Sequence, residues 1–156
     1  MAIDLETDEN ALTPQRRSFG NNAVRLGELV LARAGAALAP LDLKPLDYET
    51  MACVLHGHGM SQLDLSRRLG IYAPKMVGLL DGLEQRGLVA RKVSQVDRRR
   101  HELLLTAKGH KLLQRAMAVG AALEEELFGR VPEQDKERFA TLVERLETAE
   151  APGDPD

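Results

Sequence analysis

The sequence predicts a mainly α-helical chain with one short β-hairpin. Only 3% of its 156 residues are aromatic and Trp is absent, so Leu, Val, Ala and Met must fill the core, as in many helical proteins. Apolar residues recur at helical spacing through most of the chain. Two β-prone runs, Leu88–Val93 and Arg100–Leu105, flank the turn-forming segment Ser94–Asp97. The length is that of one domain.

The N-terminal region predicts a polar arm followed by a helix with two apolar stripes. Residues 1–14 are polar and acidic, so we expect a flexible arm there. From Gln15 to Ala39, apolar residues at steps of three and four, and a second set every seven residues, indicate a helix. The stripes comprise Phe19, Ala23, Leu26 and Val30, and Val24, Leu31 and Leu38. Two stripes indicate two contacts, one of which we assign to a second copy of the chain.

The next segment predicts a helix, then a shorter helix, a tight turn and a third helix. After Pro45, apolar residues recur as i, i+3, i+4 and i+7 and stop near Gly57. Ser61 with Asp64 three residues on forms a weaker version of the capping box, and Gly70 ends that short helix. Pro74 is tolerated in the first turn of the following helix, which runs to Gly87.

This third helix has two different faces. Met76, Leu80 and Leu83 form its buried stripe, because side chains advance by about 100° per residue. The opposite face carries Lys75, Gly78, Gly82 and Gln85. A helix with a flat outer face fits the major groove of duplex DNA. The two glycines lower helix propensity, which is consistent with close backbone approach to a ligand.

Two further helices complete the expected organisation. Thr106 is expected to cap a helix through about Phe128, and Pro132 opens a last helix ending at residue 147. Residues 148–156 are rich in Pro and acidic residues, so we expect a disordered tail. Within residues 15–147, the helices at 15–39 and 107–147 are expected to form a dimer interface beside a lobe at about 46–106.

Charge is distributed unevenly along the chain. The net charge is −3, but residues 61–111 hold eleven Lys and Arg against five Asp and Glu. The rest of the chain is therefore strongly acidic. A basic middle segment indicates a polyanionic partner.

The predicted hairpin carries the densest positive charge, at Arg98, Arg99 and Arg100. Arginine is favoured in narrow minor grooves, where negative potential is focused. The neighbouring Asp97 can orient one guanidinium through a bidentate pair. A cationic hairpin directly after a helix-turn-helix is typical of a winged helix-turn-helix.

At these residues the sequence resembles the multiple antibiotic resistance regulators, the MarR family. The resemblance covers residues 15–147 and combines several short motifs. They are Leu43-Lys44-Pro45-Leu46, Ser61 to Gly70, Leu83-Glu84-Gln85-Arg86-Gly87-Leu88-Val89, Asp97-Arg98-Arg99 and Leu105-Thr106-Ala107-Lys108-Gly109.

The resemblance implies a cytoplasmic transcription regulator, most often a repressor. It implies a homodimer on a pseudo-palindromic site in double-stranded DNA, with Arg99 in the minor groove and Asp97 orienting it. It also implies release from DNA by a small aromatic or apolar anion, and we place Tyr48 and Met51 at that effector site. The expected DNA-contacting residues are Ser61, Pro74, Lys75, Gly78, Arg91, Asp97, Arg98, Arg99 and Arg100.

One departure from the family pattern concerns the recognition helix. Family members commonly place small hydroxyl residues and an arginine there, whereas this chain has Pro74, Lys75, Val77 and Gly78. Few side chains are therefore available to read bases. This leaves open a winged-helix module that binds an acidic protein partner, although such a module has no need of a cationic hairpin tip.

Other chemistries find little support. Cys53 lies near His56 and His58, but a fourth zinc ligand is missing, so we expect a packed, inert thiol and no metal or other cofactor. A redox-sensing regulator that uses Cys53 remains the alternative. A single cysteine and the lack of an export signal or a membrane-spanning run favour the cytoplasm. No spacing indicates catalytic residues, so we expect no enzyme.

Replacing Arg99 tests the wing assignment. We expect Arg99→Ala to weaken DNA binding more than Arg68→Ala, because Arg99 is assigned to the minor groove and Arg68 to the neighbouring short helix. An electrophoretic shift titration measures both variants. An equal loss, or no loss, contradicts the assignment.

Overall fold

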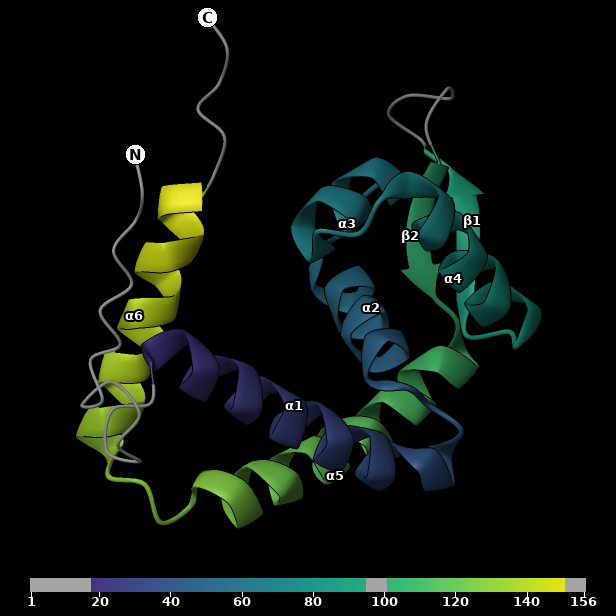
Figure 1. Cartoon of the computed structure of the whole chain (residues 1–156). Helices are drawn as coiled ribbons and strands as arrows, with labels where there is room; N and C mark the ends of the chain where they lie inside the picture. Colours follow the sequence, from purple (N-terminus) through teal and green to yellow (C-terminus); the bar gives the residue numbers. More distant parts are fainter. Residues whose placement is uncertain (1–17, 95–100, 151–156) are drawn as a thin grey trace, which may run out of the picture. The chain divides into compact units, whose positions relative to one another are not determined.

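The computed structural model describes residues 18–94 and 101–150 (Figure 1). The chain divides into two compact units, residues 1–120 and 121–156. Its elements are α1 (Phe19–Leu38), the 3-10 helix η2 (Ala39–Leu41), α2 (Pro45–His56), α3 (Gln62–Leu69), α4 (Ala73–Gln85), β1 (Val89–Val93), β2 (His101–Leu105), α5 (Ala107–Phe128) and α6 (Glu133–Glu150). The mainly helical fold with one hairpin is confirmed. The expected arm at residues 1–14 and the hairpin tip lie outside the described residues.

The helix ends follow the predicted capping chemistry. The Ser61 hydroxyl accepts a hydrogen bond from the Asp64 amide at 3.2 Å, and the Asp64 carboxylate accepts one from the Ser61 amide at 3.1 Å. Gly70 then ends α3 in the left-handed conformation with φ of 61°, which glycine adopts at little cost. These caps fix the short α3 and the turn that leads into α4.

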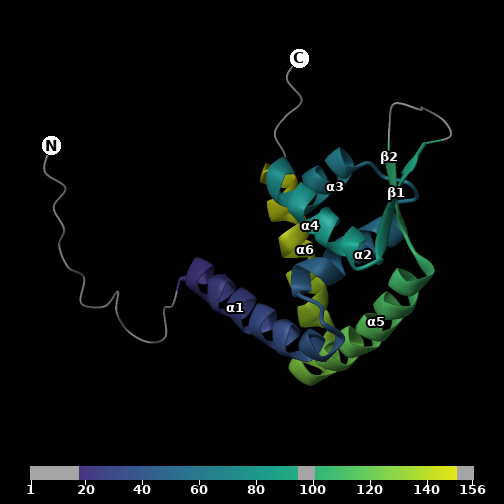
Figure 2. The ribbon, with the colours of Figure 1, turned by 90° about the vertical axis from the view of Figure 1, so that its right-hand side faces the viewer.

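The hairpin lies beside α2, α3 and α4 (Figures 1 and 2). Its strands are antiparallel, with Val89 opposite Leu105 and Val93 opposite His101. The Leu103 amide donates a hydrogen bond to the carbonyl of Met60 at 3.1 Å. The outer edge of β2 is therefore joined to the loop before α3, which fixes the base of the hairpin against the helices.

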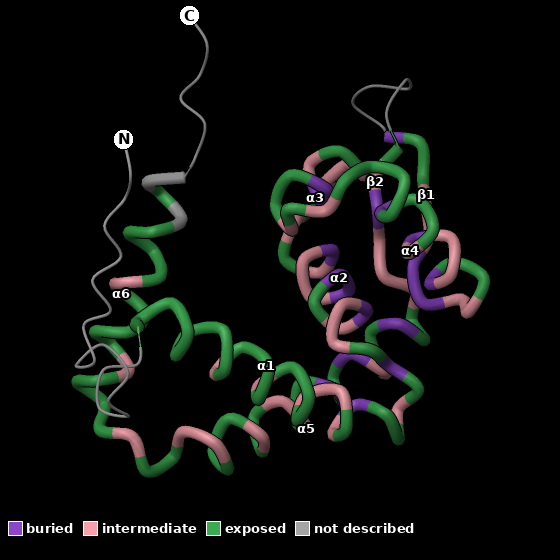
Figure 3. The backbone as a smooth tube through the Cα atoms, viewed as in Figure 1, coloured by how far each residue is buried: buried purple, intermediate pink, exposed green. Residues whose placement is uncertain are grey.

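The core of the first unit is aliphatic, as the composition predicts. The largest fully buried apolar side chains come from α2, α3, α4, the hairpin region and α5 (Figure 3). They are Met51, Leu65, Met76, Leu80, Leu83, Leu88, Leu103 and Leu113. Each such side chain contributes about 2 kcal/mol by leaving water, so one contiguous core holds the helix-turn-helix and the base of the hairpin together.

The second unit contains the end of α5 and the whole of α6. Helix α6 continues to Glu150, which corrects the expected start of a disordered tail at residue 148. Residues 147–150 contain no helix breaker, and the Thr148 hydroxyl donates to the carbonyl of Glu144 at 2.7 Å; the first proline comes later, at Pro152. In the described part of the chain, no helix is both long and apolar enough to cross a membrane.

Helix α5 begins in close contact with the start of β1. The Thr106 hydroxyl donates to the carbonyl of Gly87 at 2.6 Å and accepts from the amide of Gly109 at 3.0 Å, so Thr106 caps the helix as predicted. A Cβ atom on Gly109 would lie 2.0 Å from the carbonyl oxygen of Leu88. Only glycine lets the helix approach the strand this closely.

Substitution of Gly109 tests this approach. We expect Gly109→Ala to lower the free energy of unfolding by about 3 kcal/mol, because backbone atoms must separate to admit the methyl group. Gly120→Ala on the same helix is the matched control, since its Cβ would make an ordinary contact at 3.6 Å with the Tyr48 hydroxyl. Urea unfolding measures both variants. Equal effects would contradict the close-approach explanation.

Candidate functional site

Helix α4 is held by one face and leaves the other open. Met76, Leu80 and Leu83 are at most 1% exposed, as the predicted stripe requires. Pro74, Lys75 and Gly78, which we expected at the DNA, are exposed. Tyr72, just before the helix, is 70% exposed; sequence reasoning did not single it out, although an aromatic residue at a helix start is a usable signal. The helix therefore presents a free surface at its N-terminal half.

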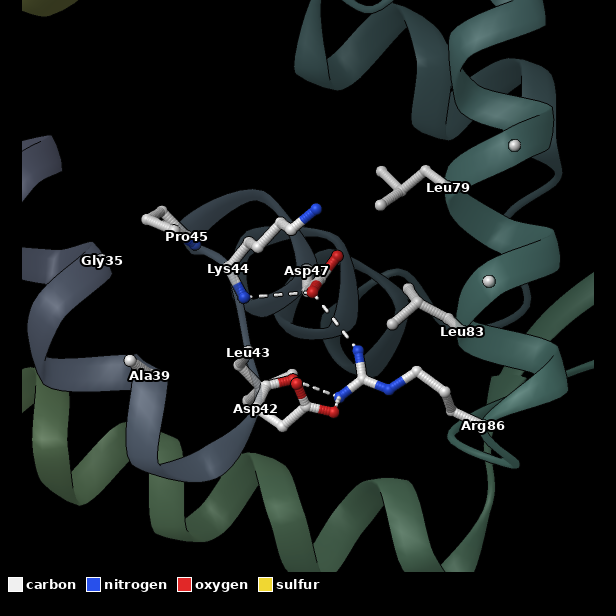
Figure 4. A pocket seen from close by; sticks show the side chains of 12 residues that line it. Gly35, Ala39, Asp42, Leu43, Lys44, Pro45, Asp47, Leu79, Leu83 and Arg86 are labelled. Carbon is white, nitrogen blue, oxygen red and sulfur yellow. Dashed lines mark hydrogen bonds and ion pairs between the residues drawn. The ribbon is translucent and has the colours of Figure 1, made fainter.

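One flank of α4 borders a cavity of about 630 Å³ (Figure 4). The opposite wall is formed by the end of α1, the segment that connects α1 to α2, and the first turn of α2. The lining residues are Gly35, Ala39, Asp42, Leu43, Lys44, Pro45, Asp47, Gly78, Leu79, Gly82, Leu83 and Arg86. Cβ atoms built on Gly35, Gly78 and Gly82 would meet nothing within 4 Å. The two glycines of α4 therefore border open space at this wall.

An ionic cluster closes the lower end of the cavity. The Arg86 guanidinium lies 3.4 Å from the Asp47 carboxylate and 3.3 Å from that of Asp42, and it also donates to the carbonyl of Asp42. Asp47 is 8% exposed and accepts a further hydrogen bond from the Lys44 amide at 3.0 Å. Arg86 thus joins the end of α4 to the start of α2.

The Lys44 side chain supplies a second cation to the cavity. Lys44 is exposed, and Figure 4 shows its side chain extending through the space between Pro45 and Leu79. The cavity therefore combines an exposed ammonium group with the apolar side chains of Pro45, Leu79 and Leu83. The lining also holds the carboxylates of Asp42 and Asp47, which pair with Arg86.

The other flank of α4 is joined to the hairpin. The Arg91 guanidinium of β1 donates to Asp81 at 2.7 Å and to Glu84, both on α4. Partial burial lowers the pKa of Arg91, but the hydrogen bond to Asp81 and the charges of Glu84 and Asp81 outweigh it, so the pKa lies above its usual value. Arg91 therefore stays charged, and its charge is offset by two carboxylates.

The remaining expected DNA contacts fall into two groups. Ser61 is half-buried, and its hydroxyl donates to the Asp64 carboxylate at 2.6 Å, so this side chain serves as a helix cap. Ser61 also borders a shallow hollow of about 360 Å³ together with Arg91 and His101. Asp97, Arg98, Arg99 and Arg100 lie outside the described residues.

The expected effector residues do not line the cavity. Met51 is fully buried in the core, and Tyr48 is half-buried, with its hydroxyl beside Gly120 of α5. Sequence reasoning did not assign Lys44 or Arg86 to a site. Both stand inside motifs that carried the family resemblance, Leu43-Lys44-Pro45-Leu46 and Leu83 to Val89, and this was the available signal.

Cys53 has the surroundings of an inert thiol. Burial raises the pKa of Cys53, and the nearby Arg68 opposes this only in part, so the thiol stays protonated at neutral pH. The His56 ring bonds through Nδ1 to the carbonyl of Ala52 at 2.8 Å. Across residues 18–94 and 101–150, no three His, Cys, Asp or Glu side chains gather where they could hold a metal ion.

Comparisons with known proteins agree with this geometry. A family model described as the MarR family matches residues 41–100. The transcriptional regulator HosA of Escherichia coli O157:H7 is 31% identical over 67% of this chain and 78% of its own length.

Two solved structures of the repressor CouR have the same fold. CouR of Rhodococcus jostii RHA1 bound to p-coumaroyl-CoA superposes with a TM-score of 0.78 at 26% identity, covering 89% of this chain and 96% of that one. CouR bound to a 23-mer DNA duplex gives a TM-score of 0.72 at 31% identity, covering 85% and 92%.

Removal of the Arg86 guanidinium tests the ionic cluster. We expect Arg86→Met to lower the free energy of unfolding by about 1–2 kcal/mol, because Asp47 is left buried without its cationic partner. Arg67→Met, at an exposed position of α3, is the matched control and should change stability by less than about 0.5 kcal/mol. Thermal and urea unfolding measure both. If Arg86→Met behaves like the control, the cluster contributes nothing to the fold.

Proposed function

Since this chain belongs to the MarR family of transcriptional regulators, we propose that it binds operator DNA as a homodimer and is released by a small anion with an apolar or aromatic body. It acts in the cytoplasm, where its DNA is found. The observation that carries this proposal is the placement of α4, which presents an open face at its N-terminal half and borders a ligand-sized cavity on one flank.

The DNA-binding part of the proposal rests on α4 and the hairpin. Lys75 is exposed at the first turn of α4, where a helix in the major groove meets base edges. The hairpin follows α4 directly and leads to Arg98, Arg99 and Arg100, which we assign to the minor groove with Asp97. CouR, 31% identical to this chain, has been solved on a DNA duplex.

The homodimer rests on apolar surface that one chain leaves uncovered. Helix α1 exposes Phe19, Val24 and Leu31 at about 60% each. Helix α6 has no buried residue among those described, and it exposes Phe139 and Leu146. Such a helix is marginal without a packed face. A two-fold dimer then presents two α4 helices to half-sites about one helical turn apart, so the operator is pseudo-palindromic.

The effector part of the proposal rests on the cavity. Its volume of about 630 Å³ lies in the range of small-molecule sites. We place the ligand there rather than at Tyr48 and Met51, because Met51 is fully buried. Lys44 meets the anionic group, while Pro45 and Leu79, which are both half-buried, meet the apolar body. CouR supports this class of ligand, since it has been solved with p-coumaroyl-CoA.

A ligand in this position contacts both walls of the cavity, so it can change the distance between them. One wall belongs to the α1–α2 connection and the other to α4. A ligand that bridges the two walls favours one distance between them, and that distance need not fit the operator. If the two states differ about 100-fold in ligand affinity, the coupling is about 2.7 kcal/mol.

A selection and release experiment tests the proposed function. Fragments bound by the full-length protein are selected from random DNA, and release is then titrated with p-coumarate, salicylate and p-coumaroyl-CoA. We expect an enriched inverted repeat, steep weakening of binding with salt, and release by at least one of these anions. Absence of any enriched sequence contradicts DNA regulation and favours the protein-interaction module.

Lys44 gives this experiment its matched variants. Lys44→Met should retain DNA affinity and lose most of the response to the releasing anion, because the ammonium partner is gone. Lys44→Arg keeps the charge and should keep most of the response. If Lys44→Met responds like the wild type, the anion binds elsewhere.

A further inference from the structure

The Arg91 side chain points from β1 to two carboxylates of α4. An arginine that only contacted a DNA phosphate would not need these two partners. The cross-strand partner of Arg91 is the buried Leu103, so the backbone of Arg91 lies midway along the paired strands, opposite a residue of the core. The two ends of its guanidinium reach Asp81 and Glu84, which lie three residues apart on one face of α4. A planar guanidinium fork can bind two carboxylates at once in a fixed direction, which a single ammonium group cannot.

The exposure of these three side chains indicates what the cluster does. Arg91 is 25% exposed, whereas Asp81 and Glu84 are 46% and 41% exposed. Solvent therefore screens much of the attraction, and the contribution of the cluster to the stability of the fold is small. The directional contacts remain, because each carboxylate oxygen fixes one side of the guanidinium. The cluster sets the position of the hairpin relative to α4 more than it stabilises either element.

This relative position matters for a protein that enters two grooves at once. Helix α4 and the hairpin are joined in sequence only by the short turn from Arg86 to Leu88. A hairpin that moves freely relative to α4 loses conformational entropy when it binds DNA. This cost lowers the affinity only for DNA sites that must contact both α4 and the hairpin.

We infer that Arg91 is a positioning residue, which through Asp81 and Glu84 holds the hairpin at the distance from α4 that simultaneous binding of the major and minor grooves requires. This rests on the proposed DNA binding of the lobe. Arg91 itself does not neutralise a phosphate, since its charge is already offset by two carboxylates.

Three variants test this role. Arg91→Ala removes the cluster, Arg91→Lys keeps the charge but loses the fork, and the exchange Glu84→Arg with Arg91→Glu reverses one ion pair at constant net charge. Lys92→Ala is the matched control, because it removes an exposed cation from the next position of the same strand. Each variant is titrated with the selected operator and with random duplex of equal length over a range of salt concentrations.

A positioning residue changes the preference for the operator, not the number of phosphate contacts. We expect Arg91→Ala to lower operator affinity about tenfold with little change for random DNA and an unchanged salt slope. The operator affinity of Arg91→Lys should fall between that of the wild type and that of Arg91→Ala, and the charge exchange should stay close to Arg91→Ala, because it sets a carboxylate of β1 against Asp81. If Arg91→Ala weakens both DNAs equally and lowers the salt slope by about 0.9, Arg91 is a phosphate ligand and the inference is wrong.

Amide hydrogen exchange in the free protein gives a second, DNA-independent readout. Exchange at β1 and β2 should be faster in Arg91→Ala than in the wild type, while α2 and α3 stay unchanged. Unchanged exchange in the hairpin overturns the inference. If the wild type binds operator and random DNA with equal affinity, the proposed function is wrong. If hairpin exchange is nevertheless faster in Arg91→Ala, the contact of Arg91 with α4 still holds the hairpin in place. If Arg91→Ala does not fold, the DNA titrations and the hydrogen-exchange measurement are made on Arg91→Lys instead.

Discussion

The burial of one face of α4 is the constraint on which the rest of the lobe depends. Met76, Leu80 and Leu83 are at most 1% exposed, and together they supply several kcal/mol by leaving water. Because side chains advance by about 100° per residue, fixing this stripe also fixes every other direction around the helix. Residues on one flank face the cavity, those on the other flank face the hairpin, and the side opposite the core is exposed at Pro74, Lys75 and Gly78. The packing of this one helix therefore determines where its cavity-facing, hairpin-facing and open sides lie.

The two flanks are each joined to a neighbour by one arginine. Arg86 connects α4 to Asp42 and Asp47 beside the cavity, and Arg91 connects it to β1. Both guanidiniums keep some contact with solvent, at 32% and 25% exposure, so solvent screens part of each attraction, and the Arg86 pair contributes to stability mainly because it leaves the buried Asp47 with a partner. Their value is geometric. An apolar core allows small sliding movements of a helix at modest cost, whereas a forked ion pair favours one arrangement, and the ligand that we propose near Lys44 would act on this arrangement.

Sequence periodicity and capping predicted the elements well because these signals are local. Ser61 with Asp64, Gly70 and Thr106 each act within a few residues of their position, and the stripe of α4 needs only its own helix. The cavity could not be predicted in this way, because Arg86 meets Asp47 and Asp42 across 39 and 44 residues of sequence. Gly78 was assigned to the groove-facing side, and it also borders the cavity, since its place depends on where α1 packs. The end of α6 at Glu150 was missed because the composition of the tail outweighed the helix-forming residues before Pro152.

The structure also changes how the basic middle of the sequence is understood. Arg86 and Arg91 belong to the excess of positive charge in residues 61–111, but each is paired with carboxylates of this same chain. Asp42 and Asp47 lie outside residues 61–111, so the charge count for that segment does not include them. They nevertheless offset the charge of Arg86, which the count treats as available to DNA. The exposed cations of this segment include Arg67 and Arg68 on α3, Lys75 at the start of α4 and Lys92 on β1, and the sequence adds Arg98, Arg99 and Arg100. Because α4 offers few side chains to read bases, we expect affinity to come largely from Arg98, Arg99 and Arg100, and specificity to depend on how accurately the hairpin is held beside the helix.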